Sequence, residues 1–192
     1  ESVSKIIEEV TMIKRDKRWV TASIKGVDPS YINISILDSS LISGTSDLWY
    51  KGIPQAIIGY GLYEKLNAHT DAQYDNNVTV YGLQRDKKLS IHNKSAFKPK
   101  IIAVGGVFDI TPEINDQYLI VPIEFARQLL NYQNDITAIE IGLKEKVNPN
   151  DIKLKLQNLL GDSYKIKTKY EKNEILFKTN ASEKWMVFLI LI

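Results

Sequence analysis

The 192-residue sequence is 44% hydrophobic and 25% charged, contains ten Tyr and carries a formal net charge of +2. This mixture is typical of a folded domain rather than a disordered tail, and the length suits one ordinary domain or two small lobes. Lys and Arg are scattered among Asp and Glu, so the chain lacks the basic stripe that a nucleic-acid partner requires. Because the sequence has no Cys, disulfides, thiolate nucleophiles and Cys-ligated zinc are excluded.

The two ends of the chain carry a second kind of signal. The chain begins at Glu1 without an initiator Met or a signal sequence, so we expect that a preceding segment was removed. Residues 185–192 form an uninterrupted apolar run, shorter than the roughly 20 residues that span a bilayer. The run is either a core element that ends a soluble fold or the start of a truncated transmembrane helix. Glu183 and Lys184 directly before Trp185 favour membrane entry at Trp185, because charged groups in water commonly precede an interfacial indole.

The first third of the chain predicts a helix, a hairpin and a loop region. Val3, Ile6, Ile7 and Val10 have helical spacing, which predicts a short amphipathic helix over residues 2–9. Residues 10–15 and 18–27 predict two strands around a tight turn at Asp16 and Lys17. Loops and short turns should follow up to Trp49.

The middle of the chain is predicted to be rich in strands. A short strand is expected at residues 55–58 and a short helix at 59–66. Residues 78–84 and 97–108 predict strands, joined by a polar loop or hairpin arm over residues 85–96.

The last third alternates strands and helices. A strand at 118–121 leads into a helix that starts at Pro122. A strand at 136–143 is followed by a helix capped by Asn148 and ended by Gly161, and then by a strand at 164–168. Residues 136–168 therefore predict a β-α-β unit, which we expect to combine with residues 1–27 in one lobe.

No motif in the sequence predicts an enzyme. Gly59-Tyr60-Gly61 begins like a dinucleotide fingerprint but has Glu64 in place of the third glycine. The sequence contains neither a GxxxxGK[ST] nor a GxSxG motif, so any ATP hydrolysis belongs to another chain. His69 and His92 lie outside any ligand-spaced cluster and are interpreted as surface residues. We expect no catalytic residues, no cofactor and no metal site.

The order of several individually weak motifs resembles a known family. From about Ser23 onward the chain resembles the extracytoplasmic domain of the MacB, LolC/LolE and FtsX-like permeases of ABC transporters. The residues that carry the resemblance are Ile24-Lys25-Gly26-Val27-Asp28-Pro29, Leu41-Ile42 with Gly44, Ile57-Ile58-Gly59 with Leu62 and Leu66, Val78-Thr79-Val80, Ile102-Ala103-Val104-Gly105-Gly106-Val107-Phe108, Asp116 with Leu119-Ile120-Val121-Pro122, Ile139-Glu140-Ile141, Asn173 to Phe177, and Glu183-Lys184.

The resemblance implies an α+β fold, the MacB-like periplasmic core domain. A split α/β lobe of the βαβ type would comprise residues 1–27 and 135–180, and an inserted β-rich lobe would comprise residues 28–134. Residues 181–192 would begin a transmembrane helix, entering the membrane at Trp185. The domain would lie on the periplasmic or extracytoplasmic side of the bacterial inner membrane.

The resemblance also implies partners rather than catalysis. Such permeases bind a cytoplasmic ABC ATPase subunit and a second permease subunit, and are anchored in the membrane by flanking helices. The first hypothesis is a permease of the lipoprotein-releasing type, which passes a lipoprotein to a periplasmic carrier. The family's carrier-binding arm corresponds here to residues 85–96, with Lys87, Lys88, Leu89, Ile91 and Phe97 as candidate contacts. A solvated hairpin without a partner is the alternative interpretation of this segment.

Three other functions remain open from the sequence. The protein could be a MacB-like exporter component, or an FtsX-like module that regulates a cell-wall hydrolase. A third, different class is a soluble binding or enzymatic domain whose apolar tail packs into its own core.

Overall fold

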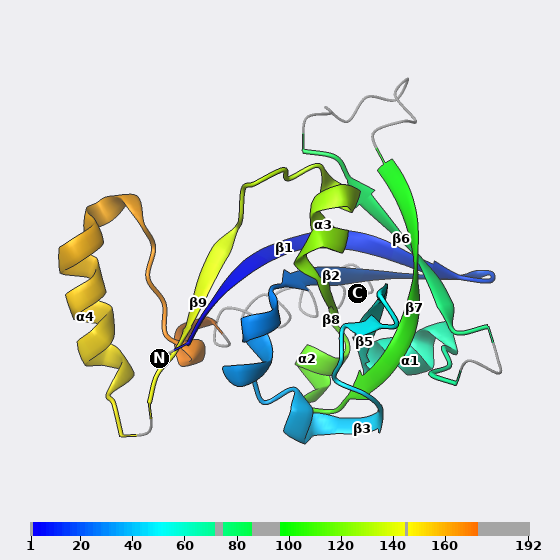
Figure 1. Cartoon of the computed structure of the whole chain (residues 1–192), viewed down its shortest axis with the longest axis horizontal. Helices are drawn as coiled ribbons and strands as arrows, with labels where there is room; N and C mark the ends of the chain where they lie inside the picture. The colour runs from blue at the N-terminus through cyan, green and yellow to red at the C-terminus, as the bar shows by residue number, and fades with distance from the viewer. Residues whose placement is uncertain (1, 72–74, 86–96, 145, 173–192) are drawn as a thin grey trace, which may run out of the picture. The chain divides into compact units, whose positions relative to one another are not determined.

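The computed structural model describes residues 2–71, 75–85, 97–144 and 146–172 (Figure 1). Contacts divide the chain into two units, Glu1–Gly142 and Leu143–Ile192, which are described separately below.

Unit 1 contains one sheet and several short helices. Its strands are β1 (Ser2–Arg15), β2 (Arg18–Val27), β3 (Leu41–Gly44), β4 (Trp49–Tyr50), β5 (Ile53–Gly59), β6 (Asn77–Leu83), β7 (Phe97–Phe108), β8 (Tyr118–Pro122) and β9 (Ala138–Gly142). Its helices are η1 (Pro29–Asn33), η2 (Asp38–Ser40), α1 (Tyr60–Leu66), α2 (Pro112–Asn115) and α3 (Ile123–Leu130).

Six of these strands form a closed ring. The pairing runs from β1 to β2, β8, β5, β7 and β6, and β6 pairs again with β1. The β2–β8 and β5–β7 pairs are parallel and the other four are antiparallel. The long strand β7 makes closure possible because its first half pairs with β6 and its second half with β5. The ring therefore has an inside, which must be filled, and an outside.

Apolar side chains fill the inside of the ring. Ile13, Ile24, Val80 and other residues that alternate along the strands are almost completely buried there. α1 contributes Leu62 and Leu66 to the same core, and α3 contributes Ala126, Leu129 and Leu130. At Gly26 a Cβ atom would lie 2.4 Å from the Cβ of Ala126, so glycine permits α3 to approach β2 this closely.

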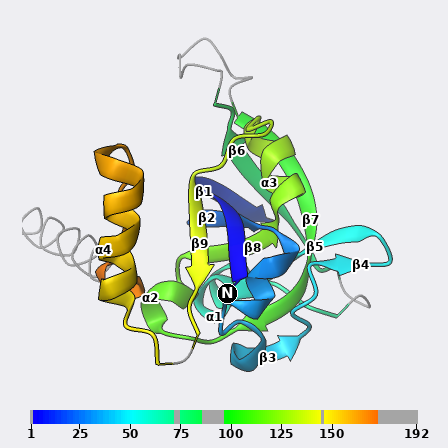
Figure 2. The same ribbon diagram turned by 60° about the vertical axis from the view of Figure 1, so that its left-hand side comes forward.

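The strand β9 pairs with the N-terminal half of β1, from Ser2 opposite Gly142 to Ile6 opposite Ala138. Both views show the yellow β9 alongside the blue start of β1 (Figures 1 and 2). Within the described part of the chain, β9 pairs with no strand other than β1. The first residues of the chain and residues 138–142 are therefore neighbours in the sheet.

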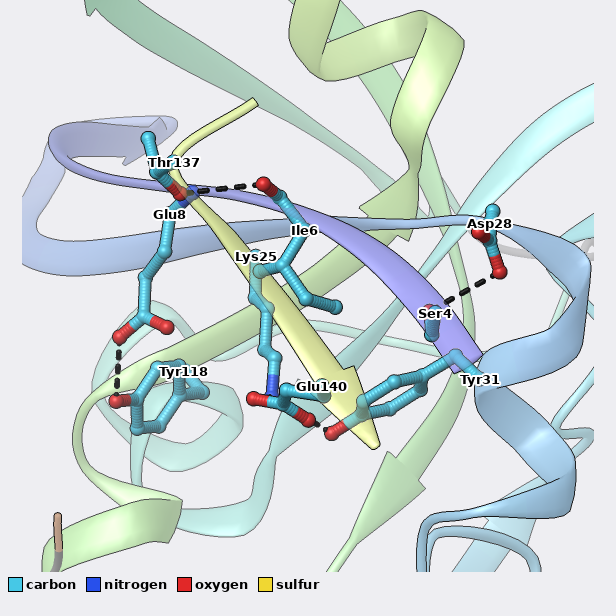
Figure 3. Close-up of polar contacts among 9 residues, drawn as sticks. All are labelled: Ser4, Ile6, Glu8, Lys25, Asp28, Tyr31, Tyr118, Thr137 and Glu140. Atoms are coloured by element: carbon cyan, nitrogen blue, oxygen red, sulfur yellow. Dashed lines mark hydrogen bonds and ion pairs between the residues drawn. The ribbon is translucent and has the colours of Figure 1, made fainter. Parts of the chain in front are cut away.

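The predicted helix over residues 2–9 is wrong, because these residues form the first half of β1. The helical pattern arose from the adjacent apolar residues Ile6 and Ile7. Both are fully buried, but on opposite faces of the strand: Ile7 faces the ring core, whereas Ile6 is on the face that carries Lys25 of β2 (Figure 3). A strand covered on both faces loses the simple alternation that identifies it in a sequence.

The other predicted strands and helices of unit 1 are confirmed within one or two residues. These are β2, β5, α1, β6, β7, β8, α3 and β9; the turn at Asp16 and Lys17 is also confirmed, although β1 begins at Ser2 and not at Val10. The predicted α+β class is also confirmed. The predicted lobes, 1–27 with 135–180 and 28–134, stay a prediction; in the sheet, β1 and β2 of the first pair with β6 and β8 of the second.

Unit 2 contains α4 (Pro149–Leu160), which begins as predicted. The side chain of Asn148 accepts a hydrogen bond from the Asn150 N–H at 3.0 Å, and Gly161 follows the last turn with a φ of 67°.

The predicted strand at residues 164–168 is wrong, because this segment is not paired in a sheet. Thr168 instead caps a helical turn that starts at Lys169. The Thr168 N–H donates to the Glu171 carboxylate at 2.7 Å, and the Glu171 N–H donates to the Thr168 hydroxyl at 3.3 Å. The β-α-β unit predicted over residues 136–168 therefore lacks its last strand.

Candidate functional site

The residues proposed from the sequence for partner binding fall mostly outside the described part of the chain. Lys87, Lys88, Leu89 and Ile91 of the arm lie there, as does Trp185 at the expected membrane entry. Phe97 is described. It is the first residue of β7 and stands opposite Leu83, the last residue of β6.

Both ends of the arm are held firmly. Leu83 and Phe97 are paired in the antiparallel β6–β7 ladder. The Arg85 N–H donates to the Leu130 carbonyl at 3.0 Å, and its guanidinium lies 2.5 Å from the Asp135 carboxylate and over the Tyr132 ring. Burial and the Glu9 carboxylate raise the pKa of Tyr132 to about 12, so its hydroxyl remains a donor to Glu9. Residues 84–96 thus join two strands whose facing ends are fixed.

Phe97 belongs to an exposed face that spans four strands, β2, β1, β6 and β7. Residues that stand directly opposite each other in neighbouring strands point to the same side of a sheet. One row across the strands is Trp19, Lys14, Thr79 and Ile101, and the next is Thr21, Met12, Tyr81 and Pro99. With Val10, Leu83 and Phe97 these residues form what we call the outer face, because the alternate residues Ile13, Val80 and Ile102 point into the core.

The outer face is apolar yet open to solvent. Val10 and Ile101 are each 67% exposed and Trp19 is 49% exposed. The Trp19 and Tyr81 rings lie against each other with centroids 4.9 Å apart, and the Lys14 ammonium lies 5.2 Å from the centre of the Trp19 ring. Trp, Tyr and Met are enriched where proteins bind one another, so this face has the composition of an interface. Sequence reasoning missed it, although large apolar residues at alternate positions on both faces of 10–14 were a usable signal.

A buried polar cluster lies farther along the same side of β1 and β2, next to η1 and to β9, which pairs with β1 (Figure 3). Lys25 is only 7% exposed, and its ammonium lies 2.7 Å from the Glu140 carboxylate and 2.9 Å from the Tyr31 hydroxyl. Burial by itself lowers the pKa of Lys25, but Tyr31 and Glu140 outweigh burial and raise it. The ion pair therefore stays charged and ties β9 to β2 across β1.

Two further contacts complete this cluster. The Tyr118 hydroxyl donates to Glu8 at 2.8 Å, and burial together with the Glu8 carboxylate raises the pKa of Tyr118. Asp28 accepts hydrogen bonds from Ser4, from Ser30 and from the Lys5 N–H. Burial alone would raise the pKa of Asp28, but these donors lower it.

The geometry of this cluster is that of a structural anchor. Each charged or phenolic group is satisfied by a fixed neighbour within the domain. Among the residues that the structure describes, no group of three or more His, Asp or Glu side chains could hold a metal ion. In the same residues, no helix is long and apolar enough to cross a membrane. The absence of enzymatic activity stays a prediction.

Comparison with known proteins relates this chain to others by structure alone. No protein-family model matches the sequence, and no curated protein matches it. The extracellular domain of the ABC-type transporter YknZ from Gram-positive bacteria is similar with a TM-score of 0.55 and 13% identity, over 85% of this chain and 75% of that one. The periplasmic region of MacB from Actinobacillus actinomycetemcomitans is similar with a TM-score of 0.54 and 15% identity, over 83% and 65% of the two chains.

These likenesses show a shared fold. The chain has the fold of extracytoplasmic domains from ABC-type transporters, as the sequence motifs predicted. The predicted MacB-like periplasmic core domain is thereby confirmed as a fold.

The Lys25–Glu140 pair yields a stability prediction. Replacing Glu140 by Gln should lower the free energy of unfolding by about 1–3 kcal/mol, because the buried Lys25 ammonium loses its carboxylate. The loss is limited to this range because Glu140 is partly exposed and water can still reach its site. Lys25→Met/Glu140→Gln should cost less than the sum of the two single changes. Urea denaturation of the four proteins measures the coupling, and additive effects would show that the pair does not act as a unit.

Asp28 yields a prediction about pH. Its folded pKa is lowered, so its stabilisation is complete above the ordinary Asp pKa and is lost as the pH falls through the folded value. Asp28→Ala should therefore lower the unfolding free energy by about 1–3 kcal/mol at neutral pH, and the difference from wild type should shrink in acid. Asp28→Asn, which keeps the capping oxygen, should retain part of the stability. Denaturation at several pH values tests this, and a pH-independent difference would contradict it.

Proposed function

We propose that this chain is the extracytoplasmic domain of a permease subunit of an ABC transporter, on the outer side of a bacterial cytoplasmic membrane. The fold shared with the extracellular domain of YknZ and the periplasmic region of MacB carries this proposal. The ordered motifs from Ser23 onward support it independently, because they follow the same family's pattern.

In this proposal the domain works through partners. The permease would bind an ABC ATPase subunit and a second permease subunit through parts of the protein outside this domain. ATP-driven motion would reach the domain through its flanking segments and would be used to handle a substrate of the cell envelope. Two features support such a role. The polar anchor around Lys25 ties β9, the last strand of unit 1, to β2. The apolar outer face can contact a protein.

Within this class we propose the lipoprotein-releasing type. Its supporting feature is the arm of residues 85–96, which lies between the paired ends of β6 and β7 in the sequence and corresponds to the carrier-binding arm of the related permeases. A MacB-like exporter component is the second candidate, and the structural likeness to MacB favours it. An FtsX-like module that regulates a cell-wall hydrolase is the third.

The proposed location predicts a labelling pattern in cells. Because the sequence has no Cys, Lys17→Cys in the protein as the cell makes it would place a single thiol in this domain, at the exposed β1–β2 turn. A membrane-impermeant maleimide should label this thiol in spheroplasts with an intact inner membrane. Ile13→Cys is the matched control, since this side chain is fully buried and should react only after denaturation. Labelling of Lys17→Cys only after lysis would refute the extracytoplasmic location.

The lipoprotein-releasing type predicts that the arm is needed for carrier binding. Deleting residues 87–94 leaves the Leu83–Phe97 pair and the contacts of Arg85 in place, so the melting temperature should change little. Binding of the periplasmic lipoprotein carrier, measured by co-purification with the complete permease, should be lost. Carrier binding that survives the deletion would show that the arm is not needed for it. If the complete permease is stable but binds no carrier even without the deletion, the exporter is favoured.

A further inference from the structure

We infer that the outer face is a docking surface for a second protein that presents a carboxylate within an apolar patch. The face comprises Val10, Met12, Lys14, Trp19, Thr21, Thr79, Tyr81, Leu83, Phe97, Pro99 and Ile101. That the partner lies outside the cytoplasm rests on the proposed function, whereas the chemistry of the face stands on the structure alone.

The apolar surface of the outer face is extended and regular. Two complete rows of side chains cross four neighbouring strands, and the rows contain Trp19, Met12, Tyr81 and Ile101. Val10, Phe97 and Ile101, with exposed fractions of 67%, 39% and 67%, extend the surface in both directions. Contiguous apolar surface of this kind is uncommon on a domain that has no partner.

The backbone beneath the outer face is held by the ring core. Ile13, Val80 and Ile102 alternate with the face residues and are buried in the ring core. Because these strands are also closed into a ring, the backbone that carries the face side chains is held in place before a partner arrives. A preorganised surface loses little conformational entropy on binding.

Lys14 identifies the chemistry of the partner. It is the one charged residue of the outer face, and it stands between Trp19 of β2 and Thr79 of β6 in the first row. Its ammonium lies over the Trp19 ring, and within the described residues it makes no ion pair. A carboxylate at the centre of an apolar patch would complement it, and such a desolvated pair contributes strongly to specificity.

A second copy of this chain fits the face poorly. In a two-fold symmetric contact the same face would meet itself, and none of its eleven residues is acidic. The outer face of the copy could therefore offer Lys14 no carboxylate.

A lipid surface also fits less well. Attraction to anionic lipids contributes about 1 kcal/mol per basic residue, so membrane-binding faces carry several of them. The outer face carries only Lys14. An ordered row of aromatic and apolar residues around a single charge is better matched by a structured protein patch.

Site-specific cross-linking tests the inference. A benzophenone amino acid replaces Thr21, an exposed residue of the face, in the complete protein in living cells, and cross-linked proteins are identified by mass spectrometry. The captured protein is then purified and titrated against the wild type and three variants. Lys14→Glu should weaken its binding about tenfold or more, because a repulsive pair replaces an attractive one. Lys14→Arg should bind within about threefold of wild type, because the charge is kept.

The control variant is Lys51→Glu, which makes the same change of charge at the exposed β4–β5 turn. It should leave binding unchanged, and all variants should keep the wild-type melting temperature. Equal affinity of Lys14→Glu and wild type would overturn the inference. So would cross-links only to a second copy of the chain, or binding only to vesicles of phosphatidylglycerol and phosphatidylethanolamine. If Lys17→Cys reacted only from the cytoplasmic side while Lys14→Glu still weakened binding of the captured protein, the proposed location would be refuted and the docking surface would stand.

Discussion

Closure of the strand ring is the constraint on which the rest of unit 1 depends. The ring closes because two strands are long enough to reach several partners. β1, with fourteen residues, pairs with β2, β6 and β9. β7, with twelve residues, pairs with β6 along its first half and with β5 along its second half. Closure removes free edges within the ring and gives each strand one side that faces a dry core. The other side is then left to be covered or exposed, and the chain does both. η1 and β9 contribute Tyr31 and Glu140 to the buried Lys25 cluster, whereas the apolar residues of the outer face, such as Val10 and Ile101, are exposed.

The covered and uncovered regions follow different chemistry on the same two strands. Next to β9 and η1, charged residues are present on β1 and β2 but are matched within the domain, as Lys25 is by Glu140 and Tyr31. A buried charge without such a match would cost several kcal/mol. Farther along the same strands most side chains are apolar, and Lys14 makes no ion pair with any residue that the structure describes. This change of character along one surface separates what stabilises the domain from what is available to a partner.

Much of the fold was predictable from the sequence because its signals are local. The Asp16–Lys17 turn, the alternation in β6 and β7, and the Asn148 cap each act within a few residues. The start of β1 was mistaken for a helix because burial on both faces comes from segments distant in sequence, such as residue 138 opposite Ile6. The strand expected at 164–168 lost to a capping box that uses Thr168 and Glu171. The apolar residues within 10–14 were a local signal for the outer face, but its extent across four strands depends on the register that places Met12 beside Tyr81.

The antiparallel pairing of β1 with β9 has a mechanical consequence. Ser2 stands opposite Gly142, so the first and last described residues of unit 1 lie side by side and lead away from the same end of the ladder. A force that separates these two ends would load the hydrogen bonds one pair at a time, from Ser2 towards Ile6, as a zipper opens. It would not stretch the whole ladder at once in shear. Glu140, which stands opposite Ser4, is bound to Lys25 of β2. Separation of β1 from β9 beyond this position would also have to break the ion pair, so a weak force would separate only the first residue pairs.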